Sequence, residues 1–154
     1  MACVCRGFTE DLWVDVGSPE RYRIATRLLL ERLTATAGAS VLGREQCHIG
    51  ENVVFEGMVA LGEGATIGDG VRIVGPSVIG TGTIVASDVL IEGTAIWESA
   101  KVGARSHIVN SIVGGSARIG ADVVLKDAVL ADGAVVGDGR HPGQGARVGP
   151  GERA

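Results

Sequence analysis

The stretch IGENVVFEGMVALGEGATIGDGVRIVGPSVIG, residues 49–80, repeats one pattern every six residues. An aliphatic or aromatic residue returns at Ile49, Phe55, Leu61, Ile67, Ile73 and Ile79. An α-helix repeats every 3.6 residues and a β-strand every two, so neither accounts for this spacing. A period of six indicates short strands joined by bends and stacked in register.

The pattern continues along most of the chain, with a few steps of five residues. We expect further inward-facing anchors at Ile84, Leu90, Ile96, Val102, Ile108, Val113, Ile119, Leu125, Leu130, Val136 and Val148. A small or β-branched residue follows most anchors by four positions and faces the same side. Glycine often follows the anchor directly, and we expect it to supply the bend through positive φ. Three hexads close a triangle, so the sequence predicts an all-β fold, a parallel β-helix of about six coils.

This pattern resembles the [LIV]-G-x-x-[AVST]-x motif of hexapeptide-repeat proteins, and the resemblance implies that the β-helix is left-handed. We place the β-helix at residues 37–154. Its last stretch, GDGRHPGQGARVGPGERA at 137–154, is rich in Gly, Pro and Arg. We expect this stretch either to protect the open edge of the last coil or to form a mobile tail.

One amphipathic α-helix is predicted before the repeats, within a first segment that spans residues 1–36. Ser18 is a good N-cap, Pro19 suits the first helical position and Gly38 ends the helix. The apolar face is expected to consist of Tyr22, Ala25, Leu28, Leu29 and Leu33. A single apolar stripe on a charged helix indicates that the helix packs against the first coil.

Charge and composition exclude several classes of partner. The chain has 154 residues, a net charge of −4 and scattered basic residues, which argues against binding to nucleic acid or to anionic membranes. It has no apolar stretch long enough to span a membrane or to form a signal sequence. Its three cysteines match neither a redox C-x-x-C motif nor a metal site. We expect a cytoplasmic protein with free thiols.

The segment LWVDVGSPERYRIATRLLL, residues 12–30, closely resembles a segment of mannose-1-phosphate guanylyltransferases and related sugar-nucleotide pyrophosphorylases. Their pattern W-x-D-[VI]-G-[TS]-P-x-x-[YF] joins the catalytic domain to a C-terminal β-helix. It is matched by Trp13, Asp15, Val16, Gly17, Ser18, Pro19 and Tyr22. The resemblance implies that Asp15 helps to hold the Mg²⁺ that bridges the phosphates, and that Trp13 and Gly17 lie close to substrate. On its own residues, Asp15 can equally brace the turn before the helix.

The Gly-rich opening of that family, G-G-x-G-[ST]-R, does not occur in this chain, and the resemblance begins too early to leave room for a nucleotide-binding domain. We therefore expect this chain alone to be inactive and to bind no cofactor. It would meet a nucleoside triphosphate and a sugar 1-phosphate only through such a domain. Its expected role is oligomerisation and positioning, as a homo-oligomer or beside a full-length nucleotidyltransferase subunit. Trp97 directly follows an anchor, points outward and is a candidate contact residue.

The alternative hypothesis is a stand-alone hexapeptide acyltransferase that uses acetyl-CoA. Enzymes of that class use a histidine as general base, and the candidates are His48 and His107. Both directly precede an anchor, so both side chains should point away from the core. With His141, the three histidines lie tens of residues apart in the sequence, which does not fit a three-histidine zinc site.

Overall fold

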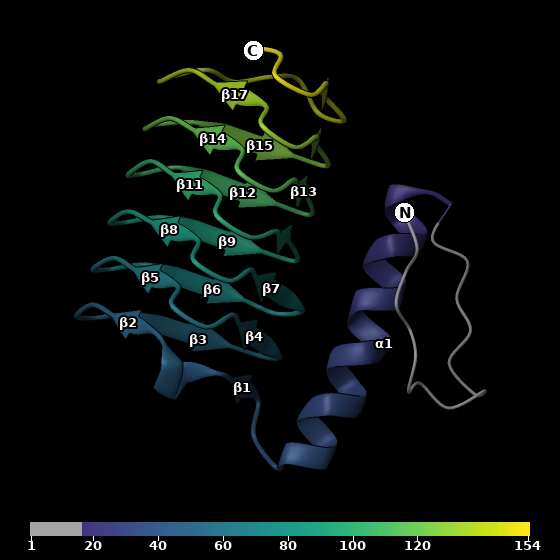
Figure 1. The fold of residues 1–154 in the computed structure, drawn as a ribbon, viewed down its shortest axis with the longest axis vertical. Coiled ribbons are helices and arrows are strands. Elements are labelled where there is room, and N and C mark those ends of the chain that lie inside the picture. Colours follow the sequence, from purple (N-terminus) through teal and green to yellow (C-terminus); the bar gives the residue numbers. More distant parts are fainter. Residues whose placement is uncertain (1–16) are drawn as a thin grey trace.

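The computed structural model describes residues 17–154 and contains helix α1 (Pro19–Ala37) followed by a column of short parallel strands (Figure 1). A short 3₁₀ helix, η1 (Arg44–Gln46), interrupts the first coil. The strands wind upward as a left-handed parallel β-helix of about six turns, so the predicted fold class is confirmed.

Three parallel sheets form the three sides of the column. The seven-stranded sheet contains β1 (Val41–Leu42), β4 (Val59–Leu61), β7 (Ser77–Ile79), β10 (Ala95–Ile96), β13 (Ile112–Val113), β16 (Val129–Leu130) and β18 (Arg147–Val148). The six-stranded sheet contains β2 (His48–Ile49), β5 (Thr66–Ile67), β8 (Ile84–Val85), β11 (Lys101–Val102), β14 (Arg118–Ile119) and β17 (Val135–Val136). The five-stranded sheet contains β3 (Val54–Glu56), β6 (Arg72–Val74), β9 (Leu90–Glu92), β12 (His107–Val109) and β15 (Val124–Lys126).

The core is a stack of aliphatic side chains, but two of the predicted anchors are wrong. Ile84 is 45% exposed and Leu90 is only half-buried, whereas Val85 and Ile91 face the core at 1% and 0% exposure. The six-residue steps therefore continue without a break as far as Ile91. Both pairs consist of two adjacent aliphatic residues, so hydrophobicity alone did not choose between them.

All three five-residue steps lie at one corner, between the five-stranded and the seven-stranded sheet. They run from Ile91 to Ile96, from Ile108 to Val113 and from Leu125 to Leu130. The register changes accordingly: Val59 pairs with Ser77, 18 residues later, but Val78 pairs with Ala95, 17 residues later. The bend at this corner is thus one residue shorter in each of these three coils.

A ladder of buried hydroxyl groups supplies hydrogen-bond acceptors to buried amides at the shortened corner. The backbone N–H of Thr94 donates to Ser77 Oγ at 3.2 Å, that of Ser111 to Thr94 Oγ1 at 3.2 Å, and that of Ala128 to Ser111 Oγ at 3.1 Å. Each hydroxyl thus accepts from a buried amide one coil above it. Because an unpaired buried N–H is costly, Ser and Thr are favoured in this stack over the Val and Ala found elsewhere in the core.

Glycine directly after an anchor is needed for close stacking rather than for positive φ. A Cβ added to Gly68 would lie 2.7 Å from the backbone carbonyl carbon of Ala86 in the next coil, and one added to Gly114 would lie 2.6 Å from that of Ala131. The positive φ angles occur later in the bend, as at Gly70 and Asp88. The predicted bends exist, but the first glycine serves clearance between the coils.

Helix α1 begins and ends as predicted, but its packed face is shifted: Tyr22, Ala25 and Leu29 of the predicted face are half-buried. Ser18 Oγ accepts from the N–H of Arg21 at 3.3 Å, and Gly38 closes the helix in the left-handed region. The fully buried residue is Leu30, whereas Leu28 and Leu33 are exposed by 36% and 44%. The helix contacts β1 of the first coil, as predicted, and also β7, so it runs along the seven-stranded sheet (Figure 1).

The Gly-, Pro- and Arg-rich end of the chain extends the β-helix. Strand β18 pairs with β16, and the backbone of Arg153 forms a bridge to Val135. The N–H of Ala154 donates to the carbonyl of Val135 at 2.8 Å. Residues 147–154 therefore cover the edge of the coil below, which is the first of the two expectations for this stretch.

The tight stacking predicts a large penalty for a single methyl group. Gly68→Ala should lower the free energy of unfolding by about 1–3 kcal/mol, because its Cβ meets backbone atoms that cannot move aside. Gly143→Ala is the matched control, since a Cβ there has no neighbour within 4 Å. Denaturant midpoints of the two variants provide the comparison. Equal midpoints would contradict the stacking argument.

The hydroxyl ladder predicts that Ser111→Ala destabilises the chain by about 1–3 kcal/mol, because the N–H of Ala128 loses its acceptor. Ser111→Thr keeps a hydroxyl in the same stack, as Thr94 does naturally, and should retain most of the stability. Thermal unfolding followed by circular dichroism measures both. If the Ala and Thr variants unfold at the same temperature, the hydroxyl ladder does not stabilise the corner.

Candidate functional site

The junction between α1 and the β-helix is held by aromatic and polar side chains from both parts. We call it the helix clamp and define it as Tyr22, Arg23, Trp97, Asn110 and Asp127. Its first half is an aromatic pair: the rings of Tyr22 and Trp97 lie 6.3 Å apart, centroid to centroid, at an interplanar angle of 30°. The indole Nε1–H of Trp97 also donates to the hydroxyl of Tyr22 at 3.0 Å.

Trp97 points away from the core, as the sequence predicts, but the helix half-covers it. It directly follows Ile96 of β10, at a position in the seven-stranded sheet where the neighbouring coils carry Gly80 and Gly114. These glycines leave room for the large ring beside the helix. The ring is therefore half-buried in a contact within this chain, and its role as a contact between chains stays a prediction.

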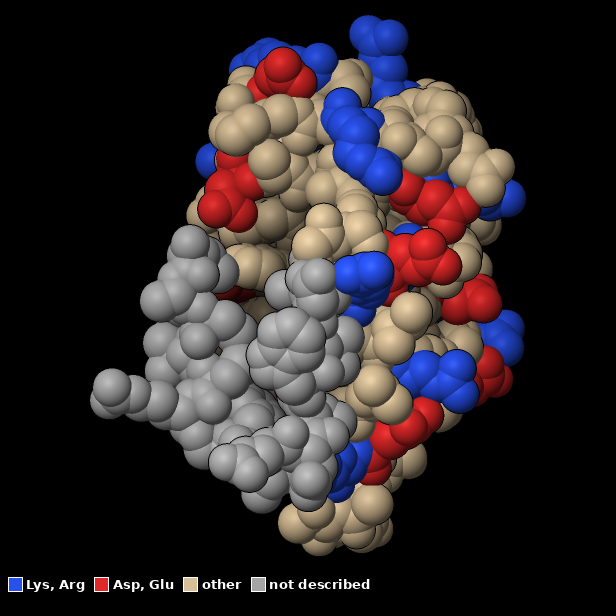
Figure 2. Space-filling model, turned by 90° about the vertical axis from the view of Figure 1, so that its right-hand side faces the viewer, with Lys and Arg blue, Asp and Glu red and all other residues tan. Residues whose placement is uncertain are grey.

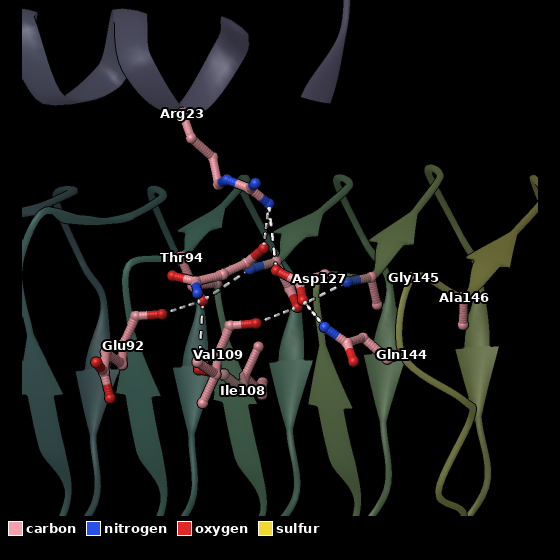
Figure 3. Close-up of polar contacts among 12 residues, drawn as sticks. Arg23, Glu92, Thr94, Ile108, Val109, Asp127, Gln144, Gly145 and Ala146 are labelled. Atoms are coloured by element: carbon pink, nitrogen blue, oxygen red, sulfur yellow. Dashed lines mark hydrogen bonds and ion pairs between the residues drawn. The ribbon is translucent and has the colours of Figure 1, made fainter. Parts of the chain in front are cut away.

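The second half of the clamp is polar. Arg23 reaches from α1 to the shortened corner, where its guanidinium donates to the carbonyl of Asn110 at 2.6 Å and lies 3.9 Å from the carboxylate of Asp127 (Figure 3). Gln144 donates to the same carboxylate at 2.6 Å from the coil above. These contacts join residues far apart in the sequence, and no motif in the sequence identified them.

The two candidate histidines are exposed, as predicted, but the structure does not bring them together. His48 lies on β2 in the six-stranded sheet and pairs with Thr66. His107 lies on β12 in the five-stranded sheet, between Leu90 and Val124. They occupy different sides and different coils of the column, so they cannot act on one substrate group within one chain.

The residues suggested by the nucleotidyltransferase motif lie at the edge of the described chain. Trp13 and Asp15 fall outside the described residues, and Gly17 is an exposed residue in the bend before α1. Among residues 17–154, no three His, Cys, Asp or Glu side chains come close enough together to hold a metal ion. The described residues thus supply no cluster of oxygen ligands of the kind that Mg²⁺ requires.

An open hollow of about 360 Å³ lies at the end of α1. It is lined by Glu31, Thr34, Ala35, Gly38, Ala39, Ser40 and Met58. Its walls contain neither a histidine nor a cysteine, and Glu31 is its one charged side chain. The hollow therefore has no paired acid and base with which to perform group transfer.

Charges on the surface are interspersed rather than gathered. On the face shown in Figure 2, acidic and basic side chains alternate over the exposed coils. Arg105 donates to Asp122 at 2.9 Å across adjacent coils, and this hydrogen bond and charge lower the pKa of the Asp122 carboxyl. Both groups are exposed, so the pair ties two bends together without marking a reactive site.

Cys47 is the free cysteine of the described chain, and it packs against the first coil of the core. It lies two residues before the anchor Ile49, so it occupies the small-residue position of its repeat. Burial is the main cause that raises the pKa of its thiol. A raised pKa disfavours the reactive thiolate.

No helix within residues 17–154 is both long and apolar enough to cross a membrane.

Two solved structures resemble this chain in shape at low sequence identity. A hexapeptide transferase family protein from Anaplasma phagocytophilum superimposes with a TM-score of 0.69 at 24% identity, over 74% of this chain and 71% of that one. A variant of perosamine N-acetyltransferase from Caulobacter crescentus, solved with CoA and GDP-perosamine, gives 0.62 at 22% identity, over 81% of this chain and 58% of that one. At such identities the likeness concerns the fold alone.

Sequence comparison gives a more specific result. No curated protein sequence matches the chain significantly. The family model described as the GMPPB C-terminal domain matches residues 55–144, which is more than half of the chain. This stretch covers the middle coils, including the shortened corner and the β-helix side of the helix clamp. The chain therefore belongs to the GMPPB C-terminal domain family.

Proposed function

We propose that this chain is the C-terminal β-helix portion of a sugar-1-phosphate nucleotidyltransferase that resembles mannose-1-phosphate guanylyltransferase. The family match over residues 55–144 carries the proposal. It is supported by the order of the sequence, in which the motif of Trp13, Asp15 and Gly17 immediately precedes α1 and the repeats. The β-helix then serves association and positioning rather than chemistry.

The helix clamp gives this positioning role a physical basis. Helix α1 starts at Pro19, directly after the motif, and Tyr22 and Arg23 in its first turns contact the β-helix. An aromatic pair and a charge-assisted hydrogen bond on adjacent residues resist rotation of the helix about its own axis. The clamp therefore fixes the orientation of α1 against the column.

The chain by itself is not expected to transfer a nucleotidyl group. The resemblance implies that Asp15 holds Mg²⁺ together with a second carboxylate from a nucleotide-binding domain. A lone carboxylate is not a Mg²⁺ site, and no cluster of ligands is present among residues 17–154. The proposed substrates are a nucleoside triphosphate such as GTP and a sugar 1-phosphate, and that domain would bind both. The proposed location of the protein is the cytoplasm.

Acyl transfer from acetyl-CoA is the second candidate, and the similar fold of an N-acetyltransferase favours it. It would require His48 or His107 to act as general base between chains, because neither faces a hollow that the structure describes. The shared fold alone does not select this chemistry.

The proposed role predicts that this chain alone has no turnover. The purified chain with Mg²⁺, GTP and mannose 1-phosphate should release no pyrophosphate above a no-protein blank, in a coupled phosphate assay. The same preparation with acetyl-CoA and amino sugars should release no free CoA thiol. Pyrophosphate release would contradict the assignment of a non-catalytic portion. Thiol release that is lost in His107→Ala or His48→Ala would favour the acyltransferase instead.

The proposed role of the helix clamp predicts that its loss loosens α1. Trp97→Ala should loosen α1, so that its amides exchange hydrogen at least about tenfold faster while those of β11 and β14 keep their rates. Tyr22→Phe keeps the ring pair and removes only one hydrogen bond, so it should have a smaller effect. Hydrogen exchange read by mass spectrometry resolves the segments. Unchanged exchange of α1 in Trp97→Ala would contradict its positioning role.

A further inference from the structure

The outward side of the five-stranded sheet carries two columns of side chains, and we call it the checkerboard face. One column is formed by Val54, Arg72, Leu90, His107 and Val124. The second column, two residues further along each strand, is formed by Glu56, Val74, Glu92, Val109 and Lys126. This is the one sheet whose strands are all three residues long, so both columns carry full side chains.

Two charged side chains on this face have no ion-pair partner among the described residues. Arg72 is paired with Glu56 at 2.8 Å, but the side chains of Glu92 and Lys126 form no ion pair within residues 17–154. Both are exposed, and they lie on β9 and β15, one coil below and one coil above β12. The helix packs on the seven-stranded sheet and leaves this side of the column open (Figure 1).

We propose that the checkerboard face docks a second copy of this chain, with the two columns antiparallel and a two-fold axis along β12. This inference rests on the proposed role of the β-helix in association. The axis places the β9 of one copy opposite the β15 of the other. Glu92 then meets the partner copy's Lys126 twice, and Leu90 meets the partner copy's Val124 twice. Such reciprocal pairing is what an isologous interface requires.

The position of the axis follows from which residues would meet their own copies. On a two-fold axis along a strand, each outward residue faces itself. An axis at β9 would oppose Glu92 to Glu92, one at β15 Lys126 to Lys126, and one at β6 Arg72 to Arg72. Like charges placed directly opposite one another are unfavourable. Strand β12 presents His107 and Val109, neither of which has a permanent charge.

The orientation of the two copies follows from the order of the columns. With the two-fold axis parallel to the β-helix and the faces fully overlapped, the columns would exchange places. Leu90 would then face Glu92, and Val124 would face Lys126, in every coil that they share. Apolar groups would be set against charges without compensation. The antiparallel arrangement keeps apolar against apolar and acid against base.

The size of the face predicts a weak dimer. With the axis along β12, only β9, β12 and β15 face counterpart strands, so the contact is about 10 Å tall and only two side chains wide. Its area is well below the roughly 800 Å² per partner of a standard interface. A dissociation constant on the order of 10–1,000 µM is therefore expected for the chain by itself.

Charge reversal tests the proposal by sedimentation equilibrium from about 10 µM to 2 mM, at low salt and pH 8. Glu92→Lys and Lys126→Glu should each weaken dimerisation at least about tenfold, because each turns two attractions into repulsions. The double variant should recover to within about threefold of the parent chain. Lys101→Glu, an exposed lysine on the six-stranded sheet, is the matched control and should have no effect.

Disulfide trapping provides an independent readout. Val109→Cys places a thiol beside the axis and should crosslink with its own copy under mild oxidation, whereas Val74→Cys, two coils away in the same column, should not. The parent chain reports the background from its natural cysteines. A monomer at 2 mM, or a dimer that is insensitive to both charge reversals, would overturn the proposed face. A dimer that is insensitive to the reversals would leave the association role intact, so the two failures are distinguishable.

Discussion

The close stacking of successive coils is the constraint on which the rest of the structure depends. Backbone hydrogen bonds join each coil to the next, as where the N–H of Gly68 donates to the carbonyl of Val85 at 2.8 Å. At that spacing several positions after an anchor, such as Gly68 and Gly114, have no room for a Cβ, and each buried amide must find an acceptor in the next coil. The core aliphatics, the glycines and the hydroxyl ladder all follow from these two demands.

The same constraint separates the functions of the three sides. Two of the sheets carry mostly glycine or alanine beside their outward column, so their surfaces are flat. On the seven-stranded sheet Trp97 breaks this rule, and α1 packs against it. The five-stranded sheet instead carries two full columns of side chains. The seven-stranded sheet thus holds α1 through Trp97, and the five-stranded sheet presents the face that we propose for a second copy.

The six-residue period predicted the β-helix, its parallel strands and the outward direction of His48, His107 and Trp97. It could not choose between Ile84 and Val85, because both are aliphatic and only the packed core distinguishes them. The stack of Ser77, Thr94 and Ser111 lies at the shortened corner, but Thr83 and Ser106 are buried at the other corners, so a buried hydroxyl alone does not identify the shortened corner. The contacts of Arg23 with Asn110 and Asp127 join distant parts of the chain, and no local pattern announces them. Trp13 and Asp15 lie outside the described residues, so their roles remain proposals.

The most direct measurement is a set of methyl–methyl nuclear Overhauser effects on chain with labelled Ile, Leu and Val. Coils that stack as described place the Ile91 methyls against those of Ile73 below and Ile108 above, and leave the Ile84 methyls without contacts inside the column. Cross-peaks that instead connect Ile84 and Leu90 to the core residues would contradict the register and the shortened corner. They would also remove the checkerboard face, because its two columns depend on that register.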